Sequence, residues 1–146
     1  MAIDVTAKII IERTPEEVAE LMFNPKKDKL WVSGLSAVYP MESGLYKKGA
    51  VIERVGTFIN KHYNCRIAVA KVEENKLVKM YGDEPFEMNI TYLLSETENG
   101  TLVKNTLTSI SEIPYDTPLG TLSKMVLDKL EGDLQKLKMH LETEAE

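Results

Sequence analysis

The sequence predicts an α+β fold in which a curved antiparallel sheet of about six to seven strands wraps around one long C-terminal helix. Near the end of the chain, apolar residues recur at steps of three and four, the period of one helical face. They are Leu119, Leu122, Val126, Leu130, Leu134, Leu137 and Leu141. A helix over residues 117–144 would be roughly 40 Å long, so its apolar face needs an equally extended cover.

A run of short segments before this helix supplies such a cover. Strands are expected over residues 50–59, 63–72, 76–81, 86–95 and 101–110. Their short connections favour antiparallel neighbours. The clearest alternation of apolar and polar residues predicts a core-facing row of Phe86, Met88, Ile90, Tyr92 and Leu94. Residues 63–72 carry apolar side chains at both parities, and the alternation in 101–110 is imperfect, so these two orientations stay open.

The N-terminal part of the chain predicts a strand followed by two short helices. Residues 3–11 are rich in β-branched side chains, which favour a strand. Thr14, Pro15 and Glu17 form the pattern of a capping box, which is typical of a helix start. The next expected elements are a second short helix and a strand, over residues 26–31 and 35–40.

The long helix divides into two halves. Thr117 is the expected N-cap, with Pro118 in the first turn. Residues 130–141 are dense in leucine, so we expect that half to pack as plain core. The N-terminal half carries small residues among Leu122, Met125 and Val126, so a pocket is expected beneath it.

Composition indicates one soluble globular domain spanning residues 1–146. Hydrophobic residues make up 43% and charged residues 28%, which is typical of a folded chain. The net charge of −5 argues against a nucleic-acid partner. The single cysteine, Cys65, excludes an internal disulfide. No apolar run approaches the 18 residues of a membrane-spanning helix, and no signal peptide is recognised. We therefore expect a cytoplasmic protein without integral membrane contact, as a monomer or weak homodimer.

Several local sequences resemble the Bet v 1-like superfamily, also called START or SRPBCC, and within it the small polyketide cyclase/dehydrase-like proteins. The similar segments are residues 9–18, 30–32, 48–51, 92–101 and 133–138. The resemblance covers nearly the whole chain and implies a helix-grip fold with a mostly apolar cavity between the sheet and the C-terminal helix. Relatives bind lipids, sterols, aromatic polyketides or plant hormones in that cavity, and a minority catalyse cyclisation or dehydration there.

The candidate ligand-binding residues are those expected to line this interior. The apolar and aromatic candidates are Trp31, Phe58, Met80, Met88, Ile90, Tyr92, Leu107, Leu122, Met125 and Val126. The polar candidates on inward-facing positions are Arg66, Tyr92, Asn105 and Ser109, which would orient a ligand. The alternative is that the apolar set is ordinary core, that Arg66 is exposed, and that Asn105 has an internal hydrogen bond.

Other chemistry has little support in the sequence. Asp133 and His140, with Lys129 and Lys136 beside them, border the apolar stripe of the long helix and are expected to form a solvated charged edge. Cys65 is expected to be a buried thiol. No metal or cofactor is expected, because ligand spacings and phosphate-binding loops are absent from the sequence.

Three functions remain after these exclusions. The leading hypothesis is the binding of a small hydrophobic or amphipathic molecule in the cavity. A cyclase or dehydratase that uses Arg66 or Tyr92 to polarise a carbonyl is the alternative. The third is a protein-interaction module, whose mark would be an exposed apolar patch outside the cavity.

Overall fold

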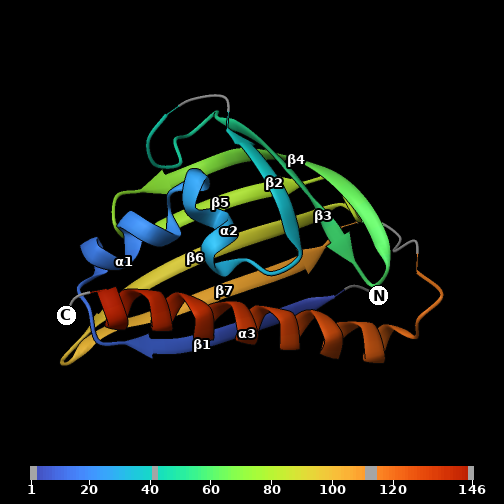
Figure 1. Cartoon of the computed structure of the whole chain (residues 1–146). Helices are drawn as coiled ribbons and strands as arrows, with labels where there is room; N and C mark the ends of the chain where they lie inside the picture. The colour runs from blue at the N-terminus through green and yellow to red at the C-terminus, as the bar shows by residue number, and fades with distance from the viewer. Residues whose placement is uncertain (1–2, 41–42, 111–114, 145–146) are drawn as a thin grey trace.

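Seven antiparallel strands form one sheet in the order β1-β7-β6-β5-β4-β3-β2, and the sheet curves around the long helix α3 (Figure 1). The computed structural model describes residues 3–40, 43–110 and 115–144. The strands are β1 (Asp4–Ile11), β2 (Leu35–Pro40), β3 (Val51–Phe58), β4 (Lys61–Glu73), β5 (Leu77–Gly82), β6 (Met88–Thr97) and β7 (Gly100–Ser109). The predicted fold class is confirmed.

The helices follow the predicted order: α1 (Pro15–Met22), the 3-10 turn η1 (Pro25–Lys27), α2 (Asp28–Trp31) and α3 (Leu119–Glu144). The capping box of α1 is confirmed, because the Thr14 hydroxyl accepts from the Glu17 amide and the Glu17 carboxylate accepts from the Thr14 amide. The predicted N-cap of α3 was wrong by one residue. The Pro118 carbonyl accepts the first helical bond, from the Leu122 amide at 2.9 Å, so the helix begins at Leu119.

Strand registers fix which side chains face the core. The predicted core-facing row is buried: Met88, Ile90, Tyr92 and Leu94 on β6, and Phe86 two residues before it. On β4 the odd-numbered residues Cys65, Ile67 and Val69 point inward, so the orientation that the sequence left open is resolved. On β7 the inward set includes Val103, Asn105 and Ser109.

The apolar stripe of α3 packs against the concave face of the sheet and is buried from Leu122 to Leu141. Its C-terminal end is held by Arg13, which donates to the carbonyls of Leu141 and Glu142 at 3.1 and 2.8 Å. The Lys138 ammonium donates to the Ile10 carbonyl of β1 at 2.9 Å. None of the described helices is both long enough and apolar enough to cross a membrane.

Candidate functional site

A cavity of about 80 Å³ lies between the concave face of the sheet and the middle of α3. Most of its wall is apolar and comes from β3, β4, β6, β7 and α3. Seven of the predicted ligand-binding residues line it: Phe58, Met88, Ile90, Tyr92, Asn105, Leu107 and Val126. The α3 side chains on the wall run from Val126 to Asp133, so the cavity lies nearer the helix centre than expected.

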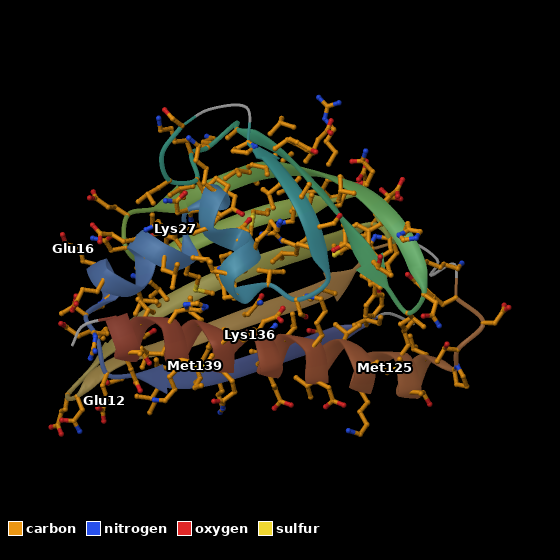
Figure 2. All side chains as sticks on the ribbon, in the orientation of Figure 1. Glu12, Glu16, Lys27, Met125, Lys136 and Met139 are labelled. Carbon is orange, nitrogen blue, oxygen red and sulfur yellow. The ribbon has the colours of Figure 1, made fainter. Side chains whose placement is uncertain are left out.

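Five predicted residues do not line the cavity. Trp31, Met80 and Leu122 are buried in the surrounding core, and the Trp31 ring packs edge-on against Tyr92 with centroids 5.5 Å apart. The inward orientations of Arg66 and Met125 were wrong. Arg66 alternates with the inward-facing Cys65 and Ile67 and is therefore exposed. Met125 is 38% exposed and lies with Met139 on the outer side of α3 (Figure 2).

Ser109 is buried as expected, but it has a structural partner. Its hydroxyl accepts a hydrogen bond from the Ile3 amide at 2.7 Å, which joins the end of β7 to the residue before β1. The residue does not line the cavity. Ser109 therefore stabilises the pairing of β7 with the N-terminal segment at the edge of the sheet, and it is not part of the candidate site.

The dominant polar feature of the site is a buried cluster around Arg54. The guanidinium donates to Asp28 Oδ2 from Nε at 3.2 Å and from Nη2 at 2.9 Å. Nη2 also lies 2.9 Å from the Tyr46 hydroxyl and 3.2 Å from the Tyr92 hydroxyl. Tyr46 donates to the same Asp28 oxygen at 2.6 Å. The cluster thus joins α2, the β2–β3 connection, β3 and β6 inside the curve of the sheet.

Burial and charge act in opposite directions on these groups. Burial raises the pKa of Asp28, while the adjacent Arg54 guanidinium and the Tyr46 hydroxyl lower it, and the net shift is upward. Burial raises the pKa of Tyr92 to about 12, although Arg54 opposes the shift. Burial by itself would lower the pKa of Arg54, but Tyr46, Tyr92 and Asp28 raise it well above its usual range. Arg54 is therefore a permanent cation on the cavity wall.

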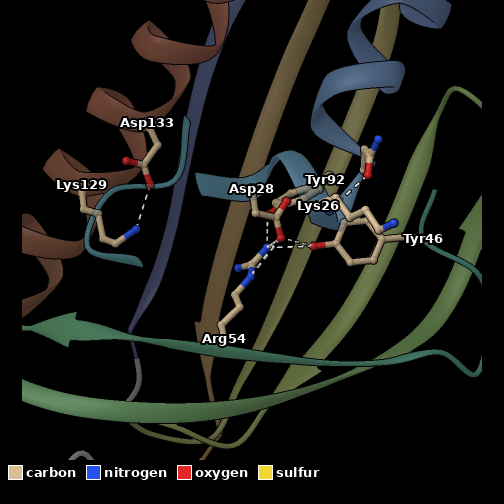
Figure 3. Close-up of polar contacts among 8 residues, drawn as sticks. Lys26, Asp28, Tyr46, Arg54, Tyr92, Lys129 and Asp133 are labelled. Atoms are coloured by element: carbon tan, nitrogen blue, oxygen red, sulfur yellow. Dashed lines mark hydrogen bonds and ion pairs between the residues drawn. The ribbon is translucent and has the colours of Figure 1, made fainter. Parts of the chain in front are cut away.

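A second ion pair reaches the cavity from α3. Lys129 Nζ lies 2.8 Å from Asp133 Oδ2, and Asp133 Oδ1 accepts from the Ser33 amide at 2.9 Å (Figure 3). Asp133 is 1% exposed. The expectation of a solvated edge was therefore wrong for this pair, because the chain after α2 covers it. Burial lowers the pKa of Lys129, and Asp133 opposes that shift.

Some polar groups on the cavity wall form no hydrogen bond with the described residues, among them the Tyr63 hydroxyl. Asn105 Oδ1 is buried and has no hydrogen-bond partner among the described residues, so the alternative of an internal hydrogen bond was wrong. An unmet buried acceptor of this kind costs about 1–3 kcal/mol. The Nη1 group of Arg54 also forms no bond with the described residues, and it points toward the side where α3 lies (Figure 3).

Sequence reasoning missed Arg54, although a signal was present. Arg54 has the same parity as Phe58, which was predicted to face inward, and both lie within one expected strand. The same alternation places Ile52 and Gly56 on the inner face. Asp28 carried no comparable signal, because a lone aspartate in a short helix is usually solvated. Cys65 lines the cavity, and burial raises the pKa of its thiol, as expected of an unreactive buried cysteine.

The curved sheet, the long C-terminal helix and the cavity between them define a helix-grip protein. No protein-family model and no curated protein sequence matches the chain. Several solved structures match the fold of the chain. The START superfamily protein from Mycobacterium smegmatis aligns with a TM-score of 0.78 and 14% identity over 96% of this chain and 97% of that one. Ara h 8.0201 aligns with a TM-score of 0.73 and 11% identity over 98% and 99% of the two chains.

The di-domain ARO/CYC StfQ from the steffimycin biosynthetic pathway aligns with a TM-score of 0.78 and 9% identity. That alignment covers 99% of this chain and 52% of the longer one. The chain therefore has the Bet v 1-like, START-type fold that the sequence resemblance implied. At these identities the likeness is one of fold alone.

Proposed function

We propose that this protein binds a small hydrophobic or amphipathic molecule in the cavity between the sheet and α3. The observation that carries the proposal is an internal cavity with mostly apolar walls and a buried, permanently charged arginine, Arg54, on one side. Burial of apolar ligand surface contributes about 25 cal/mol per Å² before the costs of ordering are subtracted. Polar wall groups would orient the ligand.

The cavity must enlarge to hold a ligand of ordinary size. Its volume of about 80 Å³ is below the roughly 300–1,000 Å³ of typical ligand sites. Met88 lies on the wall, and a methionine side chain changes shape at little cost. Leu107 and Phe58 are only partly buried, so they have room to move outward. Ligand binding is therefore expected to couple to repacking of these side chains.

Native mass spectrometry of the purified protein, with a thermal-shift panel of lipids and aromatic compounds, tests the proposal. We expect a co-purifying molecule that mild organic extraction removes, and stabilisation by at least one compound. Leu107→Phe, which fills the cavity from its wall, should weaken both signals. Met139→Phe is the matched control, because Met139 is 60% exposed on the far side of α3. Absence of any bound molecule and of any thermal shift would contradict ligand binding.

A cyclase or dehydratase activity is the second candidate. Arg66 cannot serve it, because that side chain is exposed, so this version depends on Tyr92 and on the Lys129–Asp133 pair at the same cavity. Tyr92→Phe should abolish turnover of an aromatic polyketide-type precursor and leave binding intact. Equal turnover by the variant would rule out this role for the hydroxyl group.

A docking role is less well supported. The large exposed apolar side chains are spread over β1, α2, β2, α3 and the connections: Ile10, Leu30, Tyr39, Leu45, Ile110, Met125 and Met139. A cytoplasmic location and a monomeric or weakly dimeric state belong to the same proposal, and the single cysteine supports the former.

A further inference from the structure

Two unpartnered groups on the cavity wall, one on Asn105 and one on Arg54, are chemically complementary to each other. Asn105 is 4% exposed, and its Oδ1 is an acceptor without a donor among the described residues. Arg54 is 7% exposed, and its Nη1 is a donor without an acceptor in the same part of the chain. Buried polar groups are normally paired, so Asn105 Oδ1 is expected to meet a donor in the cavity, and Arg54 Nη1 has a donor available for the same ligand.

Tyr92 links these two groups. Asn105 stands directly opposite Tyr92 in the β6–β7 register, where paired side chains have Cβ atoms about 4.5–5.5 Å apart. The Tyr92 hydroxyl lies 3.2 Å from Nη2 of Arg54. All three residues line the cavity. The Asn105 amide and the Arg54 guanidinium therefore lie on the wall of one cavity of about 80 Å³, with Tyr92 between them.

The charges around the cavity include no cation in excess. Arg54 is paired with Asp28 and Lys129 with Asp133, and Glu84 adds a further carboxylate to the wall. An anionic ligand would add an unmatched charge near both carboxylates in surroundings of low dielectric constant, which is unfavourable. A neutral polar group adds no charge and still meets the two unpartnered atoms.

We propose that the cavity selects a neutral amphiphile whose polar end is a hydroxyl group, as in an alcohol or phenol. The hydroxyl oxygen accepts a hydrogen bond from Arg54 Nη1, and its hydrogen is donated to Asn105 Oδ1. The apolar part of the ligand packs against side chains such as Met88 and Val126. This assignment rests on the proposed function and adds the polar chemistry of the ligand.

Calorimetric titration with four naphthalene probes at neutral pH tests the assignment. The probes are naphthalene and the β isomers of naphthol, methoxynaphthalene and naphthoic acid. Naphthol donates and accepts, the methyl ether only accepts, naphthalene does neither, and the acid is anionic. We expect naphthol to bind about tenfold more tightly than the ether, which lacks the hydrogen donated to Asn105 Oδ1, and this ratio corresponds to about one neutral hydrogen bond. The acid should also bind about tenfold more weakly, because it adds an unmatched charge.

The variant Asn105→Leu separates a ligand-binding role from a structural one. It should equalise the affinities for naphthol and the ether, while the melting temperature stays the same or rises because an unmet buried acceptor is removed. Asn89→Leu is the matched control on the exposed face of β6, and it should keep the tenfold difference. Arg54 is not substituted in this test, because its loss would leave the buried Asp28 carboxylate without its counter-charge.

The outcomes distinguish the two proposals. Equal binding of all four probes, or tightest binding of the acid, would overturn the hydroxyl assignment and leave ligand binding standing. An unchanged preference for naphthol in Asn105→Leu would overturn the role of the amide. Failure of every probe to bind, together with an empty native mass spectrum, would overturn the proposed function and this assignment with it.

Discussion

At the scale of single residues, Asp28 and Arg54 depend on each other. Both are buried, with 2.9 Å between Asp28 Oδ2 and Arg54 Nη2, so removal of one charge leaves the other desolvated and unpaired. We expect Asp28→Asn to lower the free energy of unfolding by about 3–5 kcal/mol. The double variant Asp28→Asn/Arg54→Met should recover most of that loss, as measured by urea denaturation. A single-variant loss below about 1 kcal/mol would contradict a fully desolvated pair.

Tyr92 should make stability depend on alkaline pH. Its pKa in the folded protein is about 12, against 10.0 for the free side chain, so the folded state holds the phenolic proton more tightly. Its contribution is complete below pH 10 and is lost as the pH rises through 12. The loss is about 2–3 kcal/mol. The stability of the wild type relative to Tyr92→Phe should therefore fall by this amount across the window, and a difference that stays constant with pH would argue against the raised pKa.

Residue-level prediction from the sequence succeeded where alternation was clean. Met88, Ile90 and Tyr92 line the cavity because one strand alternates regularly between apolar and polar residues. The choice of Arg66 failed, since β4 has apolar residues at both parities. Arg54 follows from the parity of Phe58, whereas the missing partner of Asn105 depends on packing that no local pattern encodes.

At the scale of elements, Gly100 controls the pairing of β1 with β7. A Cβ atom at this position would lie 2.1 Å from the Ile11 carbonyl oxygen, so Gly100→Ala must push the two strands apart. We expect a loss of about 2 kcal/mol or more in the free energy of unfolding. Gly132→Ala in α3 is the matched control, because nothing lies within 4 Å of its added methyl group and alanine favours the helix by about 0.5–1 kcal/mol. Equal effects of the two substitutions would contradict this packing.

Elements that depend on local sequence were predictable, and those that depend on distant contacts were not. The capping box of α1 lies within four residues, Thr14 to Glu17, and the sequence predicts it correctly. The burial of Asp133 depends on the Ser33 amide, 100 residues away in the chain. A charged residue at the border of an apolar stripe therefore carried no sign that a loop would cover it.

At the scale of the whole molecule, the strand and helix order was enough to predict the architecture. A long apolar helix requires a sheet of similar length, and the only such set of strands lies between residues 50 and 110. The volume of the cavity was not predictable, because it is the small difference between the space enclosed by the sheet and the volume of the side chains that fill it. At about 80 Å³ it holds no large ligand until side chains repack.

The most direct test of ligand binding is methyl NMR on methionine-labelled protein during titration with β-naphthol. Met88 lines the cavity, Met80 is buried away from it, and Met125 and Met139 are exposed on α3. Binding in the cavity predicts a saturable shift of the Met88 methyl resonance while those of Met125 and Met139 stay in place. An unmoved Met88 resonance, or shifts confined to the two exposed methionines, would contradict a ligand site between the sheet and α3.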